Sequence, residues 1–478
     1  YQWLEQYARN IGESAPFCVN PRRVEVPDIP GYHTYKADLH MHTIYSDAQV
    51  TPQMRVYEAW MEDVDILAIT DHHPEPRRQF GKKDMNAGYD EAAKYAGELG
   101  VRLIRGFELT GGEPVGHINV LFVKDCNDYR MKYGFTPADA DSILVRARRE
   151  GAFITANHPG WPDQNSTPSD FVAERMANGT FGAVEVFNHK EFYPLAIDQA
   201  LQYNLAMFAC TDSHYPTYYH FDQVGNHRDM TLIFARDDSD EGLKEALNAG
   251  RTIAWADNKL AGREDLLRTF LHACIKVVFV RESGNTVRFR LLNKSDIPFV
   301  LTSDDPQETV RIPANGYAET KRRKSGLLKN FKVENVYISS TERLEIPLEF
   351  LLQPEGDVCI PSIPDRSITF TDKGMSFRLV CDQGDTYYTL DGSEPDENAT
   401  LYEGGAIETE RPGVIKAVTI RDGKRSQVAS KVLNFAMAAR CKGRKHGVHY
   451  SYYEHPDLLS TTHMEQFGVL RKQGTRAY

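Results

Sequence analysis

Hydrophobic residues in the first half of the chain gather in short runs that alternate with helical stretches, as expected for strands buried on both faces. The predicted strands are Tyr35–Leu39, Ile66–Ile69, Arg102–Ile104, His117–Phe122, Phe153–Ala156, Val184–Phe187 and Met207–Cys210. Helices fit between them: Thr51-Pro52 is a start signal before Met54–Met61, and Ile143–Glu150 ends at Gly151. The alternation predicts an α/β fold, a parallel (β/α) barrel or barrel-like sheet up to about residue 265.

From Ile275 onward the hydrophobic period changes to two, as in Val287, Phe289 and Leu291. Period two with polar turns between the runs predicts small all-β sandwich domains. A Pro-rich joint at 353–364 separates two such regions. We therefore divide the chain into a barrel at residues 1–268, a β-sandwich at 269–353, a second β-sandwich at 354–437, and a tail or incomplete further β-module at 438–478.

Composition narrows the function classes. With 41% hydrophobic and 26% charged residues the chain has the composition of a globular protein, and it has no apolar run of the ~18 residues that a membrane span needs. Its net charge of −11 disfavours bulk nucleic-acid binding, although a nucleotide or a strand end remains open as a substrate. The 7 cysteines form no C-x-x-C pair, which predicts neither a disulfide framework nor a thiolate zinc site.

The strongest chemical signal is the segment from Asp38 to Asp47, which reads D-L-H-M-H-T-I-Y-S-D. On an extended strand His40 and His42 project to the same face, so both imidazoles can reach one metal ion. The flanking carboxylates of Asp38 and Asp47 can orient a ligand or bind a neighbouring ion. We therefore predict metal ligation here.

Four more polar constellations follow predicted strands. They are Thr70-Asp71-His72-His73, Gly106-Phe107-Glu108, Asn157-His158-Pro159 and Thr211-Asp212-Ser213-His214. In a barrel of parallel strands the carboxyl ends all open on one rim, where such enzymes gather their catalytic groups. Residues that are remote in sequence should therefore converge into one site.

These five motifs in this order resemble the polymerase and histidinol phosphatase (PHP) family of metal-dependent phosphoesterases. The resemblance covers roughly residues 32–265. It implies a distorted seven-stranded (β/α) barrel with two or three divalent ions, which would be Zn, Mn or Fe.

The resemblance also implies a set of ligands. His40, His42, Glu108 and Asp212 would hold one ion, and Glu108 would bridge to a second ion held by His158 and His117. His72 and His214 would hold a third. Some family members use a further histidine there, and this chain offers Asp47.

Three residues are candidates for catalysis. They are Asp38, Arg105, which precedes the Glu108 loop, and His189, which follows the predicted strand Val184–Phe187. Arg105 and the neighbouring Lys190 could grip phosphate oxygens, and His189 or a metal-bound water could protonate the leaving oxygen. The predicted function is hydrolysis of a phosphate monoester or diester of a small molecule or nucleotide, by a hydroxide activated at a di- or trinuclear centre.

Two alternatives stay open at this point. The same constellation could hydrolyse a C–N bond, or the barrel could be a scaffold in a non-catalytic, glycan-binding surface protein. Residues 387–395 and 415–426 resemble the immunoglobulin-like module of chitobiases. That resemblance implies an exported protein, periplasmic or at the cell surface, whose signal peptide is absent from this chain, with glycan or surface contact through its β-domains. A cytoplasmic location also remains open.

Overall fold

The computed structural model of the chain describes residues 22–433 except 75–83, 162–165, 222–226, 354–357, 359, 362, 364–367, 371–373 and 380–383. It also describes 448–454 and 469–476. The chain forms two compact units, Tyr1–Leu433 and Asn434–Tyr478. Among the described residues no helix has the length and apolar character that crossing a membrane requires.

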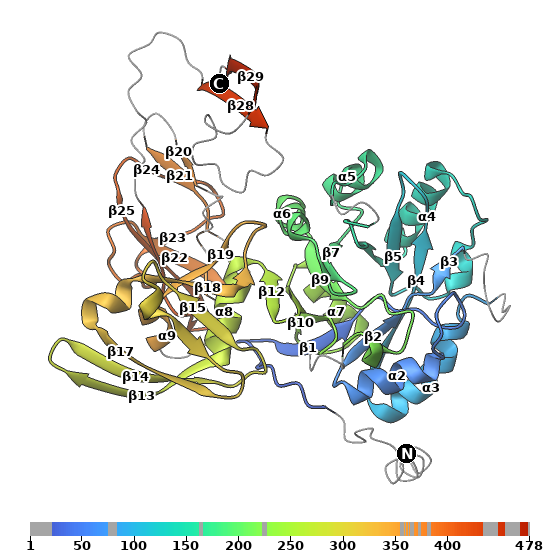
Figure 1. Cartoon of the computed structure of the whole chain (residues 1–478), viewed down its shortest axis with the longest axis horizontal. Helices are drawn as coiled ribbons and strands as arrows, with labels where there is room; N and C mark the ends of the chain where they lie inside the picture. Colours follow the sequence, from blue (N-terminus) through green and yellow to red (C-terminus); the bar gives the residue numbers. More distant parts are fainter. Residues whose placement is uncertain are drawn as a thin grey trace. The chain divides into compact units, whose positions relative to one another are not determined.

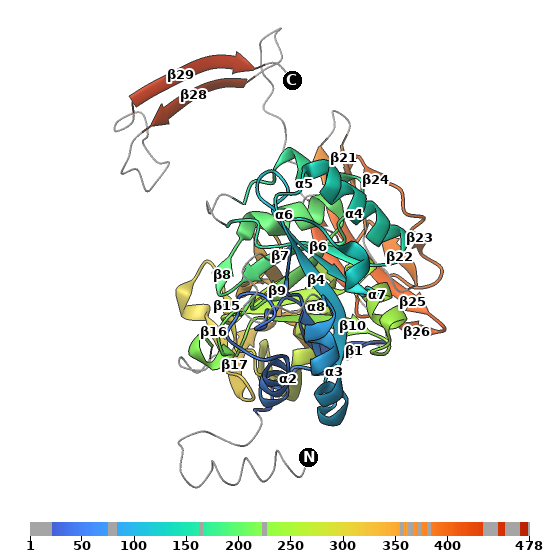
Figure 2. The same ribbon diagram turned by 90° about the vertical axis from the view of Figure 1, so that its right-hand side faces the viewer.

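The first part of the larger unit is an α/β barrel with helices on its outside (Figures 1 and 2). Its strands are β1 (His33–Asp38), β2 (Ile66–Ile69), β4 (Arg102–Thr110), β5 (His117–Leu121), β6 (Phe153–Ala156), β7 (Ala183–Asn188), β9 (Ala206–Cys210), β10 (Met230–Ala235), β11 (Thr252–Ala256) and β12 (Lys259–Gly262). Its helices are α2 (Pro52–Met61), α3 (Ala87–Leu99), α4 (Pro137–Arg149), α5 (Asp170–Ala177), α6 (Pro194–Tyr203), α7 (Asp240–Asn248) and α8 (Glu264–Cys274). The α/β barrel expected from the sequence is confirmed.

Only part of the barrel sheet is parallel. β1, β2 and β4 pair in parallel, as do β6, β7 and β9, whereas β5 lies antiparallel between β4 and β6, and β10 lies antiparallel beside β1. β5 is antiparallel to β4 because only the short loop between Thr110 and His117 connects them. A parallel pair needs a crossover connection of about a dozen residues or more. The β11–β12 turn places Asp257 and Asn258 at positive φ, as in a tight hairpin.

One edge of strand β9 pairs with β7, and its other edge is hydrogen-bonded to threonine hydroxyls of β10 and β11. Thr231 Oγ1 accepts a hydrogen bond from the backbone N–H of Ala209 at 2.9 Å and donates one to its carbonyl at 3.0 Å. Thr252 Oγ1 accepts from the N–H of Met207 at 3.0 Å. Because a hydroxyl both donates and accepts, it satisfies buried backbone groups where the strands separate. The barrel is distorted at this seam.

The residues after α8 form a β-rich continuation. Its elements are β13 (Ile275–Ser283), β14 (Thr286–Asn293), β15 (Phe299–Thr302), β16 (Val310–Ile312), β17 (Tyr317–Arg323), β18 (Asn330–Tyr337), β19 (Arg343–Pro347) and the short helix α9 (Leu348–Leu352). β18 pairs in parallel with β12, through Leu260 with Val336 and Ala261 with Tyr337, so this region extends the barrel sheet. The division at residue 268 falls within α8 and separates β12 from β18, although these two strands pair in one sheet. The domain boundaries stay predictions.

A further β-region follows. Its strands are β20 (Thr369–Phe370), β21 (Met375–Phe377), β22 (Asp385–Thr389), β23 (Thr400–Leu401), β24 (Ile407–Thr409), β25 (Gly413–Arg421), β26 (Lys424–Arg425) and β27 (Ala429–Leu433). They belong to two sheets, one of β20, β21 and β24 and one built around β25. His272 of α8 contacts this region, with Nδ1 3.3 Å from the Gln427 amide nitrogen. In the smaller unit, β28 (Val448–Glu454) and β29 (Val469–Arg476) pair antiparallel.

Candidate metal centre

Two segments, residues 40–42 and 212–214, run side by side beyond β1 and β9. The backbone N–H of Asp212 donates to the carbonyl of His40 at 2.9 Å, and Met41 and Ser213 form a parallel bridge. Because side chains alternate along extended chain, the side chains of residues 40 and 42 share one face. On that face His42 Nε2 lies 2.9 Å from Asp212 Oδ1. The register of these two segments thus joins the first and the last sequence motif.

Strand β4 brings a second set of donors to the same place. Its register sets Glu108 opposite His72 of the short strand β3 (His72–His73) and Thr110 opposite His117. Glu108 Oε1 lies 3.2 Å from His117 Nδ1, 3.3 Å from His40 Nε2 and 3.5 Å from His158 Nε2. Its Oε2 contacts His72 Nδ1. The sequence predicted Glu108 just past a strand end, but β4 runs on to Thr110 and carries this buried glutamate inside it.

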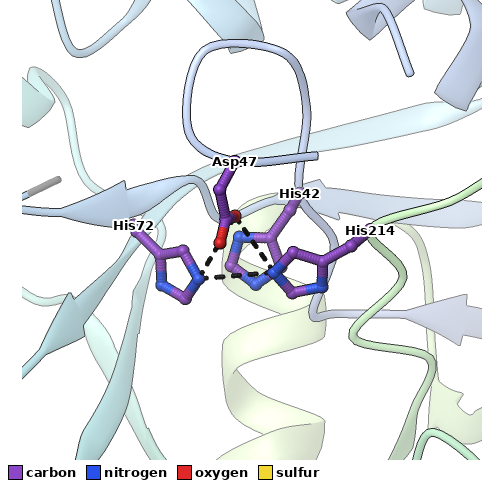
Figure 3. Close-up of side chains that lie close together, drawn as sticks. All are labelled: His42, Asp47, His72 and His214. Carbon is purple, nitrogen blue, oxygen red and sulfur yellow. Dashed lines mark hydrogen bonds and ion pairs between the residues drawn. The ribbon is translucent and has the colours of Figure 1, made fainter. Parts of the chain in front are cut away.

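Three overlapping groups of donor atoms result, and within each group the atoms lie within 4.8 Å of one another. They are His40, His42 and Asp212; His72, Glu108 and His117; and His42, Asp47, His72 and His214. Figure 3 shows the last group, in which the Asp47 carboxylate points toward the imidazoles. His214 Nε2 is 3.1 Å from Asp47 Oδ1 and 3.4 Å from His72 Nε2. His158 lies beside these groups, with Nε2 3.9 Å from Asp212 Oδ2. The structure thus brings all the predicted ligand residues together.

The geometry of these groups fits divalent cations. His40 Nε2 and His42 Nε2 are 3.1 Å apart, close to the ~3.3 Å that separates two nitrogens bound to one tetrahedral zinc ion. Oδ1 of Asp47 and Oδ1 of Asp212 are buried, and no donor among the described residues is aligned with them, although ring nitrogens lie nearby. A buried carboxylate oxygen without a donor is unfavourable unless a cation compensates it. Imidazole and carboxylate together suit Zn, Mn or Fe.

Three groups of the cluster, His42, Asp212 and Glu108, are held in the protonation states that bind metal. At His40, His72, His158 and His214 the neighbouring carboxylates outweigh burial and raise the pKa, so a cation that binds these rings has to displace a proton. Burial, reinforced by the nearby imidazoles of His72 and His214, lowers the pKa of His42 well below its usual range. Burial opposes ionisation of Asp212, but His40 and His42 outweigh it and hold the pKa of this carboxyl well below its usual range. The pKa of Glu108 is likewise lowered against burial, by His117, His72 and His40. A neutral imidazole and ionised carboxylates are the ligand forms of these groups.

Backbone strain is found at two of these residues. Asp212 has φ of 47° and His158 has φ of 21°, values that L-residues with side chains rarely adopt. Such conformations cost about 1–3 kcal/mol each and persist where the surroundings hold them. The N–H of His158 is held by Glu185 Oε2 at 2.7 Å, and that of Asp212 by His40. Strained residues of this kind cluster at functional sites.

Glu185 of β7 is a functional residue that the sequence analysis missed. Its Oε1 is 2.8 Å from His40 Nδ1, which turns the other ring nitrogen of His40 toward the donor group. The pairing of β7 with β9 shifts register between Glu185 and Phe187, a bulge that re-aims side chains at this point. The available signal was a single carboxylate inside the otherwise apolar run Val184–Phe187. Carboxylates that hold a ligating histidine in this way tune metal affinity.

Arg55 of α2 was also missed. Its guanidinium is fully buried and donates to three backbone carbonyls: Nε to His42 at 2.8 Å, Nη2 to Ser213 at 2.6 Å and Nη1 to Tyr215 at 2.9 Å. Nη1 also contacts Glu58 Oε2 at 2.9 Å. One side chain therefore ties together the two segments that carry His42 and His214. Nothing in the predicted helix distinguished this arginine from an ordinary helical one.

Asp38 supports the site from outside the donor groups. Its Oδ2 accepts from Thr211 Oγ1 at 2.7 Å and from Arg228 Nη1 at 3.1 Å, and its side chain is completely buried. Asp38 thus holds the backbone and side chain of Thr211, the residue before Asp212, and its predicted role in orienting a ligand stays a prediction. Arg228 Nε contacts Glu62 Oε2 at 2.7 Å and so links the segment to α2.

The structure does not bring Arg105 or His189 to the donor groups. Arg105 is three residues from Glu108 in β4 and so faces the other side of the strand, where it contacts Asp90 at 3.0 Å and stacks on Tyr89. His189 Nδ1 lies 3.2 Å from the Thr211 carbonyl, and its ring packs against His220. Lys190 Nζ lies over the ring of Phe221. The predicted contacts of Arg105, His189 and Lys190 with substrate stay predictions.

Buried Asp229 makes stability depend on pH. Burial, together with Asp38 and Asp257, raises the pKa of its carboxyl to about 7, although the Lys190 N–H at 2.9 Å and the Lys190 charge lower it. Because the folded pKa lies above the unfolded one of about 4, the folded state holds a proton that the unfolded state releases. This group should therefore destabilise the fold as pH rises from about 4 to 7, by at most ~1.4 kcal/mol per pH unit. In Asp229→Asn this loss should be absent, which urea unfolding at pH 5 and pH 8 measures. Equal pH slopes in the two proteins would contradict the assignment.

Comparison with known families gives two matches along the chain. The family model described as "PHP domain" matches residues 38–161, and the one described as "Fn3 associated" matches residues 378–433. The first match contains Asp38, His72, Glu108 and His158. The second contains both stretches that resemble the chitobiase module and supports an additional C-terminal module.

Several known proteins are similar to this chain. The solved structure of a two-domain protein from Bacteroides vulgatus, described as containing a predicted PHP-like metal-dependent phosphoesterase, is 32% identical with a TM-score of 0.63, and the match covers 68% of this chain and 98% of that one. A 5′-3′ exoribonuclease from Haemophilus influenzae is 38% identical over 77 residues, which are 16% of this chain and 24% of the exoribonuclease, so the chain spans about a quarter of this curated relative. A histidinol phosphate phosphatase from Lactococcus lactis, solved with Zn, L-histidinol and phosphate, is 15% identical with a TM-score of 0.26, covering 40% of this chain and 95% of that one, and is too distant to support an argument.

Proposed function

The chain belongs to the PHP-like metal-dependent phosphoesterases, and on this premise we propose that it hydrolyses a phosphate ester whose phosphoryl group binds at the donor groups around Glu108. The observation that supports this proposal most strongly is the convergence itself. Donors from five separate sequence motifs meet within a few ångströms on one side of the barrel, and Glu108 contacts histidines from three of the other motifs as well as His117 of β5. A scaffold without chemistry has no need of such a set.

We propose two firmly held ions and a weaker third. A neutral imidazole has one free acceptor nitrogen and can ligate one ion. The group of His40, His42 and Asp212 and the group of His72, Glu108 and His117 share no residue, so both can be filled at once. The third group uses His42 and His72 again, which leaves it Asp47 and His214. Two ligands hold an ion less tightly than three, so this position should fill last.

The chain's own residues define the rest of the site. When bound, divalent ions would supply Lewis acidity and lower the pKa of water toward neutrality. Asn157 Nδ2 donates to Glu108 Oε1 at 2.9 Å and fixes the plane of that carboxylate, while Glu185 fixes the ring of His40. His40 and His42 have no exposed surface, whereas the side chains of Asp47 and His214 are 36% and 28% exposed. Substrate should therefore approach from the side of Asp47 and His214.

We propose a phosphorylated small molecule or a nucleotide as the substrate. The net charge of −11 supports a small substrate over a long polyanion. The name of the exoribonuclease relative is consistent with a phosphodiester, although the similarity covers a small part of that protein. No observation favours C–N hydrolysis or a purely glycan-binding role, and export and glycan contact stay predictions.

The test is metal analysis coupled to a substrate panel. Protein reconstituted with Zn or Mn and freed of excess metal should hold two ions per chain, with a third at high metal concentration. It should hydrolyse at least one member of a panel of phosphomonoesters, phosphodiesters and nucleotides, and a chelator should remove both metal and activity. Less than one ion per chain would overturn the multinuclear centre. Full metal content with hydrolysis of an amide panel alone would overturn the phosphoesterase.

A further inference from the structure

Trp161 stands at the edge of the donor groups and is exposed. Its ring centroid lies 5.5 Å from that of His117 and 5.7 Å from that of His158. Even with these two contacts the residue is 57% exposed, so much of the indole surface is open to solvent. Among the other described tryptophans, Trp255 is buried and Trp60 is half-buried. Single exposed apolar residues are common on protein surfaces, and the contacts with two candidate ligands set this one apart.

The backbone holds Trp161 in a fixed turn. Its N–H donates to the carbonyl of His158 at 3.0 Å, which closes the turn through Pro159 and Gly160. A Cβ at Gly160 would lie 2.5 Å from the ring of Tyr193, so the turn packs directly on that buried tyrosine. Tyr193 is itself anchored, with its hydroxyl donating to Glu191 Oε2 at 2.6 Å. The indole is thus carried by a turn that is hydrogen-bonded and packed on Tyr193, and an aromatic side chain with only two torsions loses little conformational entropy when it binds a ligand.

We propose that Trp161 is a stacking platform for the organic part of the substrate, which would carry a flat ring, either a nucleobase or the apolar face of a sugar. The inference rests on the proposed phosphoesterase function. A phosphoryl group at the donor group of His72, Glu108 and His117 is joined to its organic part by one ester oxygen, so that part must lie within a few bonds of His117. Trp161 occupies this neighbourhood. Indole binds flat rings by stacking and is tolerant of which ring is offered.

If Trp161 is a stacking platform, removing its ring should reduce the discrimination between substrates that carry a ring and substrates that do not. The probes are adenosine 5′-phosphate, glucose 6-phosphate and glycerol 3-phosphate, or the methyl diesters of these three if the panel shows a preference for diesters. In metal-loaded full-length protein, Trp161→Ala should raise KM for the preferred ring substrate about tenfold to a hundredfold. It should leave KM for the glycerol ester and inhibition by inorganic phosphate within about twofold. Trp161→Phe should retain most of the preference. The matched control is Tyr317→Ala, which removes an exposed aromatic ring from β17 and should change neither ratio.

The outcomes separate this inference from the function on which it rests. If metal-loaded wild-type protein hydrolyses none of the panel, the proposed function fails. If wild-type protein hydrolyses its substrates but Trp161→Ala changes the ring and glycerol esters equally, or changes neither, the function stands and the platform is overturned. A larger effect on the adenosine ester than on the glucose ester identifies a nucleobase as the stacked group, and the reverse identifies a sugar.

Discussion

Glu108→Gln should reduce turnover of the preferred phosphate ester by more than about 100-fold and lower the metal content of the protein. Glu108 is completely buried, and its two oxygens contact His117, His40, His158 and His72. The amide keeps the volume of the side chain but removes its charge and replaces one oxygen with a donor, which repels both a cation and a protonated ring. Loss of a partner outside the ligand shell typically costs 10–100-fold in affinity or activity, and a central ligand should cost more. Metal analysis and kcat/KM on the same preparation measure the two effects.

Two further variants test whether Glu108 is the central ligand. Glu185→Gln alters the same chemical group one step farther out, since Glu185 lies outside the donor groups and contacts His40 Nδ1 and the backbone N–H of His158. It should reduce metal affinity about 10–100-fold. His214→Ala removes a residue of the weak third group alone, so it should spare the first two ions. If Glu108→Gln retains full metal content and turnover, Glu108 is not the central ligand. If its effect is no larger than that of Glu185→Gln, the proposed central role is likewise contradicted.

Arg55→Met should destabilise the fold by about 3–5 kcal/mol, the usual effect of breaking a buried ion pair, because it leaves the carboxylate of Glu58 buried without its cation. It also frees the carbonyls of His42, Ser213 and Tyr215, so the spacing between the ligand-bearing segments is no longer fixed. Metal affinity should therefore fall by about 10–100-fold even in the fraction that is folded. Urea unfolding gives the first quantity, and titration with a metal-sensitive dye at low temperature gives the second.

Stability and metal affinity can be separated with a second buried arginine. Arg251 donates from Nε to the carbonyl of Phe234 at 3.1 Å and pairs with Glu245, away from the ligand-bearing segments. Arg251→Met should lower the free energy of unfolding without changing metal affinity, whereas Arg55→Lys, which keeps the charge, should recover part of both losses. Equal metal affinity in Arg55→Met and wild-type protein would show that Arg55 stabilises the fold alone and does not position the ligands.

Which donor residues converge could be predicted from the sequence. His40 and His42 alternate on an extended segment, and His72, His158 and Asp212 each stand just after an apolar strand. Such patterns depend on a few neighbouring residues and on the general rule that strand ends share a rim. The α/β class followed in the same way from the spacing of apolar runs. Local pattern therefore predicted most of the residues that meet, and the resemblance to the PHP family added His117.

Tertiary structure alone decided how they meet and what surrounds them. The antiparallel β5, the bulge beside Glu185 and the continuation of β4 past Glu108 set the direction of each donor, and these depend on pairing register between distant strands. Arg55 reaches Ser213 across 158 residues of chain, and no local pattern encodes such a contact. Likewise, the open face of Trp161 exists because a turn packed on Tyr193 holds the ring beside His117. Sequence specified the donors, and long-range packing fixed their spacing, because hydrogen-bond geometry acts through space and leaves no periodic signature along the chain.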